Sequence, residues 1–70
     1  MKLNYAMRNS NLNIGDYVEV IADDCYHNGM IGKITKKQSN TFIVYFEEEE
    51  NNELNVYDFF PSDLVLSKYY

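Results

Sequence analysis

The sequence predicts an all-β fold, a small five-stranded barrel with a short 3-10 turn before its last strand. Short stretches of β-branched and aromatic residues alternate with polar positions, turn-forming residues recur about every ten residues, and no segment repeats with a helical period. The chain has 70 residues, which is room for one small domain. A barrel suits so small a sheet because it leaves few strand edges open.

The domain is predicted over residues 14–68, after a polar and flexible tail of residues 1–13. Gly15 and Asp16 indicate a turn, because glycine and aspartate favour the backbone conformations that turns require. The turn leads into a first strand over residues 17–21, whose apolar and polar side chains alternate with a period of two.

The segment 22–29 is too rich in Asp, Asn and Gly to extend the first strand, so we expect a loop there. Residues 30–35 form the second strand. Gly32 inside this strand indicates a bulge, a bend or a close backbone approach. The polar residues 36–40 then predict a turn.

The strongest strand covers residues 41–47, where the β-branched and aromatic residues are most concentrated. An acidic loop over 48–53 follows, because consecutive like charges repel one another in a packed element. A fourth strand is expected over 54–59. The 3-10 turn is expected within 60–63, where proline interrupts the pairing, and a last strand over 64–66.

The predicted core follows from the side of each strand that carries the apolar residues. In the fourth strand we place Val56 toward the core, and Tyr57 and Phe59 toward solvent. The expected core residues are Val18, Val20, Ile34, Phe42, Val44, Phe46, Val56 and Leu64, with Ile31, Leu54 and Leu66 behind them.

The loop over 22–29 is the first candidate for a protein-binding surface. Loops often carry binding residues, and an amphipathic ring offers contact area together with a polar group. The alternative is a solvent-exposed connection in which Tyr26 caps the end of the barrel. The candidate binding residues of this loop are Asp23, Asp24, Tyr26 and His27.

Tyr45 and Tyr57 are the second candidate. If the third and fourth strands place them side by side, the two rings form an aromatic stripe of the kind found at protein interfaces. The alternative is an ordinary cross-strand pair that only stabilises the sheet.

The acidic run Glu47–Glu50 is the third candidate, with Glu48 and Glu49 as its contact residues for a basic protein partner. The alternative is a loop that faces only water. Calcium is disfavoured because a calcium loop needs a glycine for its sharp turn, and no glycine follows Gly32.

Cys25 and His27 raise the question of metal binding or catalysis. They are the only cysteine and the only histidine, whereas a structural zinc site needs four ligands. A Cys–His nucleophile also needs an orienting third group, which the sequence does not supply. We therefore expect no metal, no cofactor, no catalytic residue and no small-molecule substrate, and predict that the protein is not an enzyme.

The net charge of −5 disfavours a dedicated nucleic-acid binder, because phosphate contact by Lys and Arg supplies most of the affinity of such domains. Residues 41–70 contain seven acidic residues and one basic residue, so this half favours a positively charged partner. The only basic cluster is Lys33, Lys36 and Lys37, and RNA binding through these lysines is the alternative function.

No apolar run approaches the roughly 20 residues of a membrane span, so we expect no membrane insertion. One cysteine excludes an internal disulfide, which favours a reducing compartment such as the cytoplasm.

Two parts of the chain resemble the KOW-type SH3-like barrels. The segments Ile14–Ile21 and Gly29–Ile34 are similar to the opening of such barrels, and Phe42–Phe46 with Phe60–Leu64 resembles their closing. The resemblance covers about residues 14–66. It implies a non-catalytic protein-interaction module or a small accessory subunit of a larger complex, or a KOW-like domain that binds RNA or the ribosome.

Within these barrels, two photosynthetic groups share the layout. They are the small stromal subunit of photosystem I and the ferredoxin-docking S subunit of the photosynthetic NDH complex, in which a stretch resembling Asp23-Asp24-Cys25-Tyr26 follows the first strand. This resemblance implies a third function, an accessory subunit of a photosynthetic electron-transfer complex, located in the plastid stroma.

Overall fold

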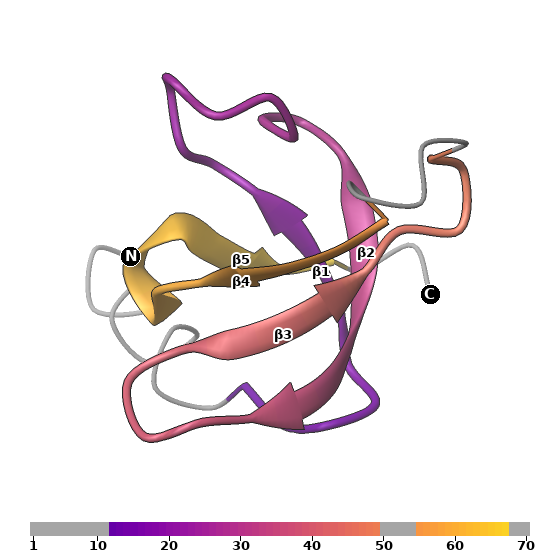
Figure 1. Ribbon diagram of the computed structural model, residues 1–70. Coiled ribbons are helices and arrows are strands. Elements are labelled where there is room, and N and C mark those ends of the chain that lie inside the picture. The colour runs from indigo at the N-terminus through magenta and orange to yellow at the C-terminus, as the bar shows by residue number, and fades with distance from the viewer. Residues whose placement is uncertain (1–11, 50–54, 68–70) are drawn as a thin grey trace.

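The computed structural model describes residues 12–49 and 55–67, and it confirms the all-β class (Figure 1). Five strands form one sheet in the order β4-β3-β2-β1-β5, and every neighbouring pair is antiparallel. A 3-10 turn, η1, stands before the last strand, as the sequence predicts. The elements are β1 (Tyr17–Val20), β2 (Ile31–Lys37), β3 (Phe42–Tyr45), β4 (Val56–Phe59), η1 (Pro61–Asp63) and β5 (Leu64–Leu66).

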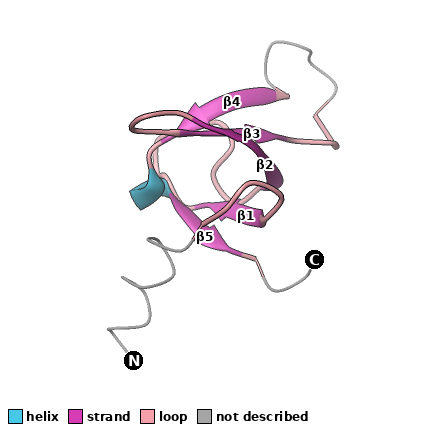
Figure 2. Ribbon diagram, turned by 90° about the horizontal axis from the view of Figure 1, so that it is seen from below, coloured by secondary structure: helices cyan, strands magenta, loops and turns pink. Residues whose placement is uncertain are grey.

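The sheet curls around the core without closing into a hydrogen-bonded barrel. Within the described residues, β4 and β5 form the two edges of the sheet, and β5 pairs only with β1. Figure 2 shows the strands following one another around an arc, with η1 at its open side between β4 and β5. The short connection through Pro61 carries the chain across this opening. The five strands expected from the sequence therefore form an open, strongly curved sheet whose edges are β4 and β5.

The second strand is longer than the sequence predicts. Lys36 and Lys37, which we expected in a turn, pair with Ile43 and Phe42 of β3. A bulge between Ile34 and Lys36 shifts the register, and such a bulge bends a strand and increases its twist. This bend lets β2 pair with β1 along one half and with β3 along the other.

Seven of the eight principal core predictions are correct, and the error lies in β4. Val56 is 50% exposed, whereas Phe59 is buried at 4%. The register explains the reversal, because Phe59 lies opposite the buried Phe42 and therefore shares its face of the sheet. The buried hydrophobic residues are Leu12, Val18, Val20, Ile34, Phe42, Val44, Phe46, Phe59 and Leu64.

The packed part of the chain extends further toward the N-terminus than predicted. Leu12, which we assigned to the tail, is buried in the core. It is followed by a turn in which the amide of Asp16 donates to the carbonyl of Asn13 at 3.0 Å, while the amide of Asn13 donates to the Asp16 carboxylate at 2.9 Å. The prediction of a flexible tail over residues 1–11, and the domain's last residue, Lys68, lie outside the described residues.

Gly32 marks a close approach between strands, one of the three outcomes expected for it. A Cβ atom built on Gly32 lies 2.5 Å from Cγ1 of Val44 and 2.8 Å from the carbonyl oxygen of Tyr45. No side chain fits at these distances without moving β3. The glycine therefore lets β2 and β3 pack the core face of the sheet closely.

Candidate functional site

A groove of about 750 Å³ opens between the loop after β1 and the segment formed by β4 and η1. We call it the loop groove. It brings together five residues that the sequence identifies as protein-binding candidates, from positions far apart in the chain. Its lining consists of Ile21, Ala22, Asp23, Asp24, Cys25, Tyr26, His27, Tyr57, Asp58, Phe59, Phe60 and Asp63.

The loop that forms one wall of this groove is folded by successive tight turns. The amide of Cys25 donates to the carbonyl of Ala22 at 3.0 Å, and the amide of Asn28 donates to the carbonyl of Cys25 at 3.1 Å. Gly29 has a φ of +88°, a conformation that favours glycine. Its amide donates to the carbonyl of Val20 at 2.8 Å, which returns the chain to the end of β1. The loop therefore presents its side chains from a defined backbone.

His27 forms the floor of the groove, where the sequence suggested an exposed binding residue. Its side chain is 1% exposed and stacks on Phe46, with ring centroids 4.3 Å apart and planes 15° apart. Phe59 meets it edge-on at 5.8 Å. His27 thus anchors the loop to the core, and it supports the binding surface from below.

Tyr26 and Tyr57 both lie next to His27. Their ring centroids lie 5.2 Å and 5.4 Å from that of His27. Tyr26 is 67% exposed, Tyr57 is 47% exposed, and Phe60 at the next bend is 58% exposed. Exposed aromatic rings gathered in a groove are typical of protein-interaction surfaces.

Glu49 holds the hydroxyl of Tyr26 and so extends the groove toward the acidic loop. The negative charge of the Glu49 carboxylate, followed by its hydrogen bond with the phenol, raises the pKa of Tyr26 above its ordinary value. Desolvation contributes in the same direction. Glu49 therefore lies beside Tyr26 at the loop groove, although the sequence analysis placed it in a separate binding candidate, the acidic run.

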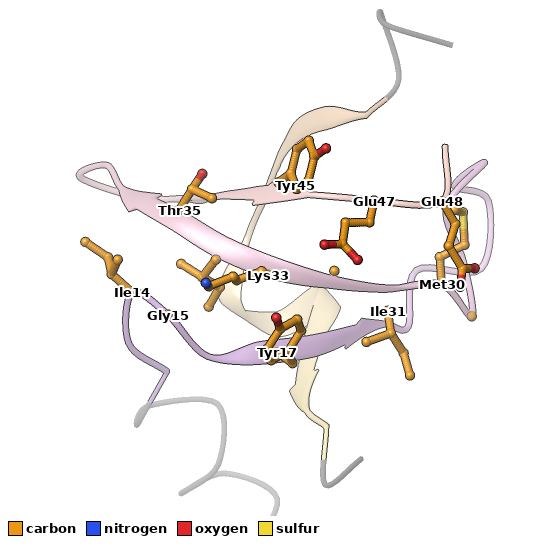
Figure 3. Close-up of a pocket in the computed structure, with 13 residues that line it drawn as sticks. Ile14, Gly15, Tyr17, Met30, Ile31, Lys33, Thr35, Tyr45, Glu47 and Glu48 are labelled. Atoms are coloured by element: carbon orange, nitrogen blue, oxygen red, sulfur yellow. The ribbon is translucent and has the colours of Figure 1, made fainter. Parts of the chain in front are cut away.

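Tyr45 and Glu48 lie elsewhere, in a second groove of about 770 Å³ on the outer face of the sheet, which we call the outer groove. Figure 3 shows Lys33 between Tyr17 and Tyr45, with Glu47 on the same face. The register places Tyr17, Lys33 and Tyr45 in one row across β1, β2 and β3. The Nζ atom of Lys33 lies 5.8 Å from the centroid of Tyr17.

The predicted stripe of Tyr45 and Tyr57 does not form. Tyr57 lies opposite the buried Val44, while Tyr45 lies opposite the exposed Val56. Successive residues of a strand point to opposite faces, so the two tyrosines belong to different surfaces. The prediction placed Tyr45 and Tyr57 on the same face because the register between β3 and β4 could not be derived from the sequence.

The three lysines lie on β2, and Lys33 and Lys36 face the same side of the sheet because they pair with Tyr45 and Ile43 of β3. Lys33 lines the outer groove together with Glu47 and Glu48. The ammonium of Lys37 lies 5.8 Å from the centroid of the Phe42 ring. Lys36 lies beyond the bulge, opposite Ile43. The carboxylates of Glu47 and Glu48 therefore lie in the same groove as Lys33, the lysine that lies between two tyrosine rings.

Cys25 and His27 lie close together, with Sγ 3.9 Å from Nδ1. Across residues 12–49 and 55–67, no three His, Cys, Asp or Glu side chains are grouped in a way that could hold a metal ion. The sulfur atom instead accepts a hydrogen bond from the backbone amide of His27 at 3.4 Å, within the turn.

The lining residues that were not predicted as binding residues include Ile21, Phe60 and Asp63. Phe60 and Asp63 were read only as parts of the strand-breaking segment, and Ile21 only as a strand residue. The available signal was a phenylalanine directly before a proline. Phe60 is extended, and the strand ends there because Pro61 cannot donate a hydrogen bond to a neighbouring strand.

No protein-family model matches this chain, and no curated protein matches it. In the part of the chain that the structure describes, no helix is long and apolar enough to span a membrane.

Proposed function

We propose that this protein is a non-catalytic SH3-like interaction module that binds a positively charged segment of another protein, as a separate domain or as a small accessory subunit of a complex. The observation that carries the proposal is the composition of the loop groove. Tyr26, Tyr57 and Phe60 are exposed there, beside four aspartates and no lysine or arginine. The SH3-like part of the proposal is supported by the resemblance of the sequence, by the five antiparallel strands and by the 3-10 turn before the last one.

The partner's charge follows from complementarity. Asp23, Asp24, Asp58 and Asp63 line the groove, and Glu49 stands at Tyr26. An acidic surface attracts a basic segment and repels an acidic one, which sets both the rate and the specificity of association. The apolar rings supply the contact area that the charges alone do not provide.

Selection of binding peptides from a random displayed library tests this proposal. We expect the selected peptides to carry a net positive charge and to include apolar residues. They should bind the wild-type protein and lose binding to the variants Tyr26→Ala and Tyr57→Ala, each checked for folding by circular dichroism. The matched control is Tyr45→Ala, which removes an exposed tyrosine of similar size from the outer groove. Peptides without positive charge, or equal loss of binding in the Tyr45 variant, would contradict the proposal.

RNA binding is the second candidate, and one observation favours it. Lys33 stands between the half-buried Tyr17 and the exposed Tyr45, and aromatic rings beside a cation are suited to stacked bases and phosphates. Glu47 and Glu48 line the same groove and oppose phosphate binding. The loop groove has no such internal conflict of charge, which is why we place protein binding first.

The resemblance to the photosynthetic subunits now concerns the same surface. The stretch from Asp23 to Tyr26 that carries it lies along one wall of the loop groove. An accessory role in a photosynthetic complex would therefore also use this groove, with a basic partner surface.

A further inference from the structure

The loop groove combines aromatic rings and carboxylates in a way that distinguishes between positively charged side chains. Its two exposed tyrosines both lie next to a single buried ring, His27, at centroid distances of 5.2 Å and 5.4 Å. Tyr26 meets that ring edge-on at 84°, whereas Tyr57 is tilted by 35°. The two tyrosine rings therefore stand at a large angle to one another, and both side chains are exposed to solvent.

Two contacts within the chain favour one position of the Tyr26 ring in the absence of a partner. Its ring rests on His27, which is buried against Phe46, and its hydroxyl is hydrogen-bonded to Glu49. A ring that is held in place loses little conformational freedom when a ligand stacks on it, and this preorganisation favours affinity.

The carboxylates beside these rings have no positively charged neighbour among the residues that line the groove. The described lysines lie on β2, whereas the groove is formed by the loop after β1, by β4 and by η1. Asp23 and Asp24 are exposed on the loop next to Tyr26. A cation that enters the groove therefore meets both a ring face and a carboxylate.

We infer that the loop groove recognises an arginine side chain of the partner segment, stacked on a tyrosine and hydrogen-bonded to the neighbouring aspartates. This inference rests on the proposed function and specifies the group that is bound. A guanidinium is planar, stacks on aromatic faces and presents a fork of donors that matches a carboxylate. A lysine ammonium is a compact and strongly hydrated point charge, and it uses this combination of groups less well.

The experiment compares three versions of the tightest-binding peptide from the displayed library, with arginine, lysine or citrulline at the arginine position. Citrulline keeps the planar shape of arginine and removes its charge. By fluorescence polarisation, we expect lysine to weaken binding about tenfold and citrulline to weaken it further. Equal binding of the arginine and lysine peptides, or selected peptides that contain lysine and no arginine, overturns the inference and leaves the proposed basic partner intact.

Two sets of protein variants assign the preference to the groove. Tyr26→Leu and Tyr57→Leu keep an apolar side chain and remove the aromatic face, so we expect the difference between arginine and lysine peptides to disappear. The double variant Asp23→Asn, Asp24→Asn should weaken both peptides. Tyr45→Leu, in the outer groove, is the control and should leave the preference unchanged. A preference that persists in both loop-groove tyrosine variants overturns the stacking part of the inference.

A second copy of this chain is the competing occupant, because the sequence contains one arginine, Arg8. Analytical ultracentrifugation of the protein alone distinguishes this case. We expect a monomer at micromolar concentration. A dimer that disappears in the Arg8→Ala variant would overturn the assignment of the groove to a different protein.

Discussion

Tyr26 illustrates how one exposed side chain is given a fixed orientation. Its ring stands on the edge of the buried His27, and its hydroxyl meets the carboxylate of Glu49. The proximity of Glu49 cannot be inferred from sequence distance, since two strands separate it from Tyr26. The result is an exposed ring with a contact at its face or edge and a carboxylate near its hydroxyl, and such contacts favour one orientation for recognition.

The pKa of Tyr26 tests this arrangement. Because the Glu49 charge and hydrogen bond favour the neutral phenol, the pKa of Tyr26 lies above the ordinary value of 10.0. The variant Glu49→Gln removes the charge, and we expect the pKa of Tyr26 to fall toward 10.0 in an NMR titration of isotope-labelled tyrosine rings. Glu48→Gln is the matched control. An unchanged titration of Tyr26 in the Glu49 variant would contradict the contact.

The same contact has a consequence for stability at high pH. The folded-state pKa of Tyr26 is raised, so the stabilising contribution is present below the ordinary value of 10.0 and is lost as the pH rises through the folded-state value. The direction of the effect is therefore a loss of stability in the alkaline range, and it should be smaller in the Glu49→Gln variant.

Gly32 is the residue at which an added methyl group is least tolerated. Its position leaves 2.8 Å to a backbone carbonyl of β3, which cannot rotate away as a side chain can. We expect Gly32→Ala to lower the free energy of unfolding by about 1–3 kcal/mol, the usual cost of overpacking a core. Urea unfolding measures this change. A variant as stable as the wild type would show that β2 and β3 do not approach so closely.

Among the elements, β4 shows what the register decides. Both faces of this strand carry apolar side chains, Val56 on one face and Tyr57 and Phe59 on the other, so the sequence alone does not show which face is buried. Pairing with β3 places Phe59 opposite Phe42 and turns the aromatic face toward the core. The same pairing separates Tyr57 from Tyr45 and brings Tyr57 to the loop groove.

Two conservative substitutions in β4 test this register. We expect Phe59→Leu to cost about 1–2 kcal/mol of unfolding free energy, because it removes part of a buried ring. Val56→Ala should change it by less than about 0.5 kcal/mol, as is usual for exposed positions. Chemical unfolding of both variants is the measurement, and the opposite order of costs would support the register predicted from sequence.

His27 is the buried residue of the loop after β1 and one of the attachments of this loop to the sheet. His27 contacts Phe46 and Phe59, and its backbone and that of Cys25 close the turns of the loop. A loop rich in aspartate and asparagine gains little from burial elsewhere. The stacked His27 ring therefore determines both the shape of the loop and the floor of the groove.

Replacing this ring should loosen the loop. We expect His27→Ala to lower the free energy of unfolding by about 2–4 kcal/mol, because it leaves a cavity beside Phe46. Hydrogen exchange should increase at the amides of residues 25–30. Asn28→Ala, in the same loop but exposed, is the control and should have little effect. Unchanged exchange in the His27 variant would contradict its anchoring role.

For the whole molecule, the distribution of charge separates the two candidate functions. The acidic groups of the loop groove lie on one side of the chain's fold, and the lysines of β2 contribute to a different surface. A peptide and an RNA would therefore bind at different places and respond differently to the net charge of −5.

Salt-dependent binding distinguishes these partners. We expect a basic peptide to bind more weakly as ionic strength rises from about 50 mM to about 200 mM, because exposed charges are screened. We expect no binding of single-stranded RNA at about 50 mM salt, where phosphate contacts are strongest. Fluorescence titration measures both. RNA binding that is lost in the Lys33→Ala variant, together with no peptide binding, would place the RNA function first.

The sequence was sufficient for features that depend on neighbouring residues. Alternation of apolar residues predicted the five strands, proline predicted the 3-10 turn, and Gly15 predicted a turn. For Gly32 the sequence left open a bulge, a bend or a close approach, and the structure shows the close approach. Most of the core followed as well, since strands with one strongly apolar face allow only one orientation. The candidate residues of the loop were also chosen from sequence.

The tertiary structure decided the features that depend on pairing between distant segments. Register set the inner face of β4, the bulge carried β2 through Lys36 and Lys37, and the sheet remained open between β4 and β5. Stacking on Phe46 buried His27 and thereby brought Tyr26 and Tyr57 to one groove. The physical reason is that local preference acts along a few residues, whereas the lining of this groove combines residues about 30 positions apart, such as Tyr26 and Tyr57.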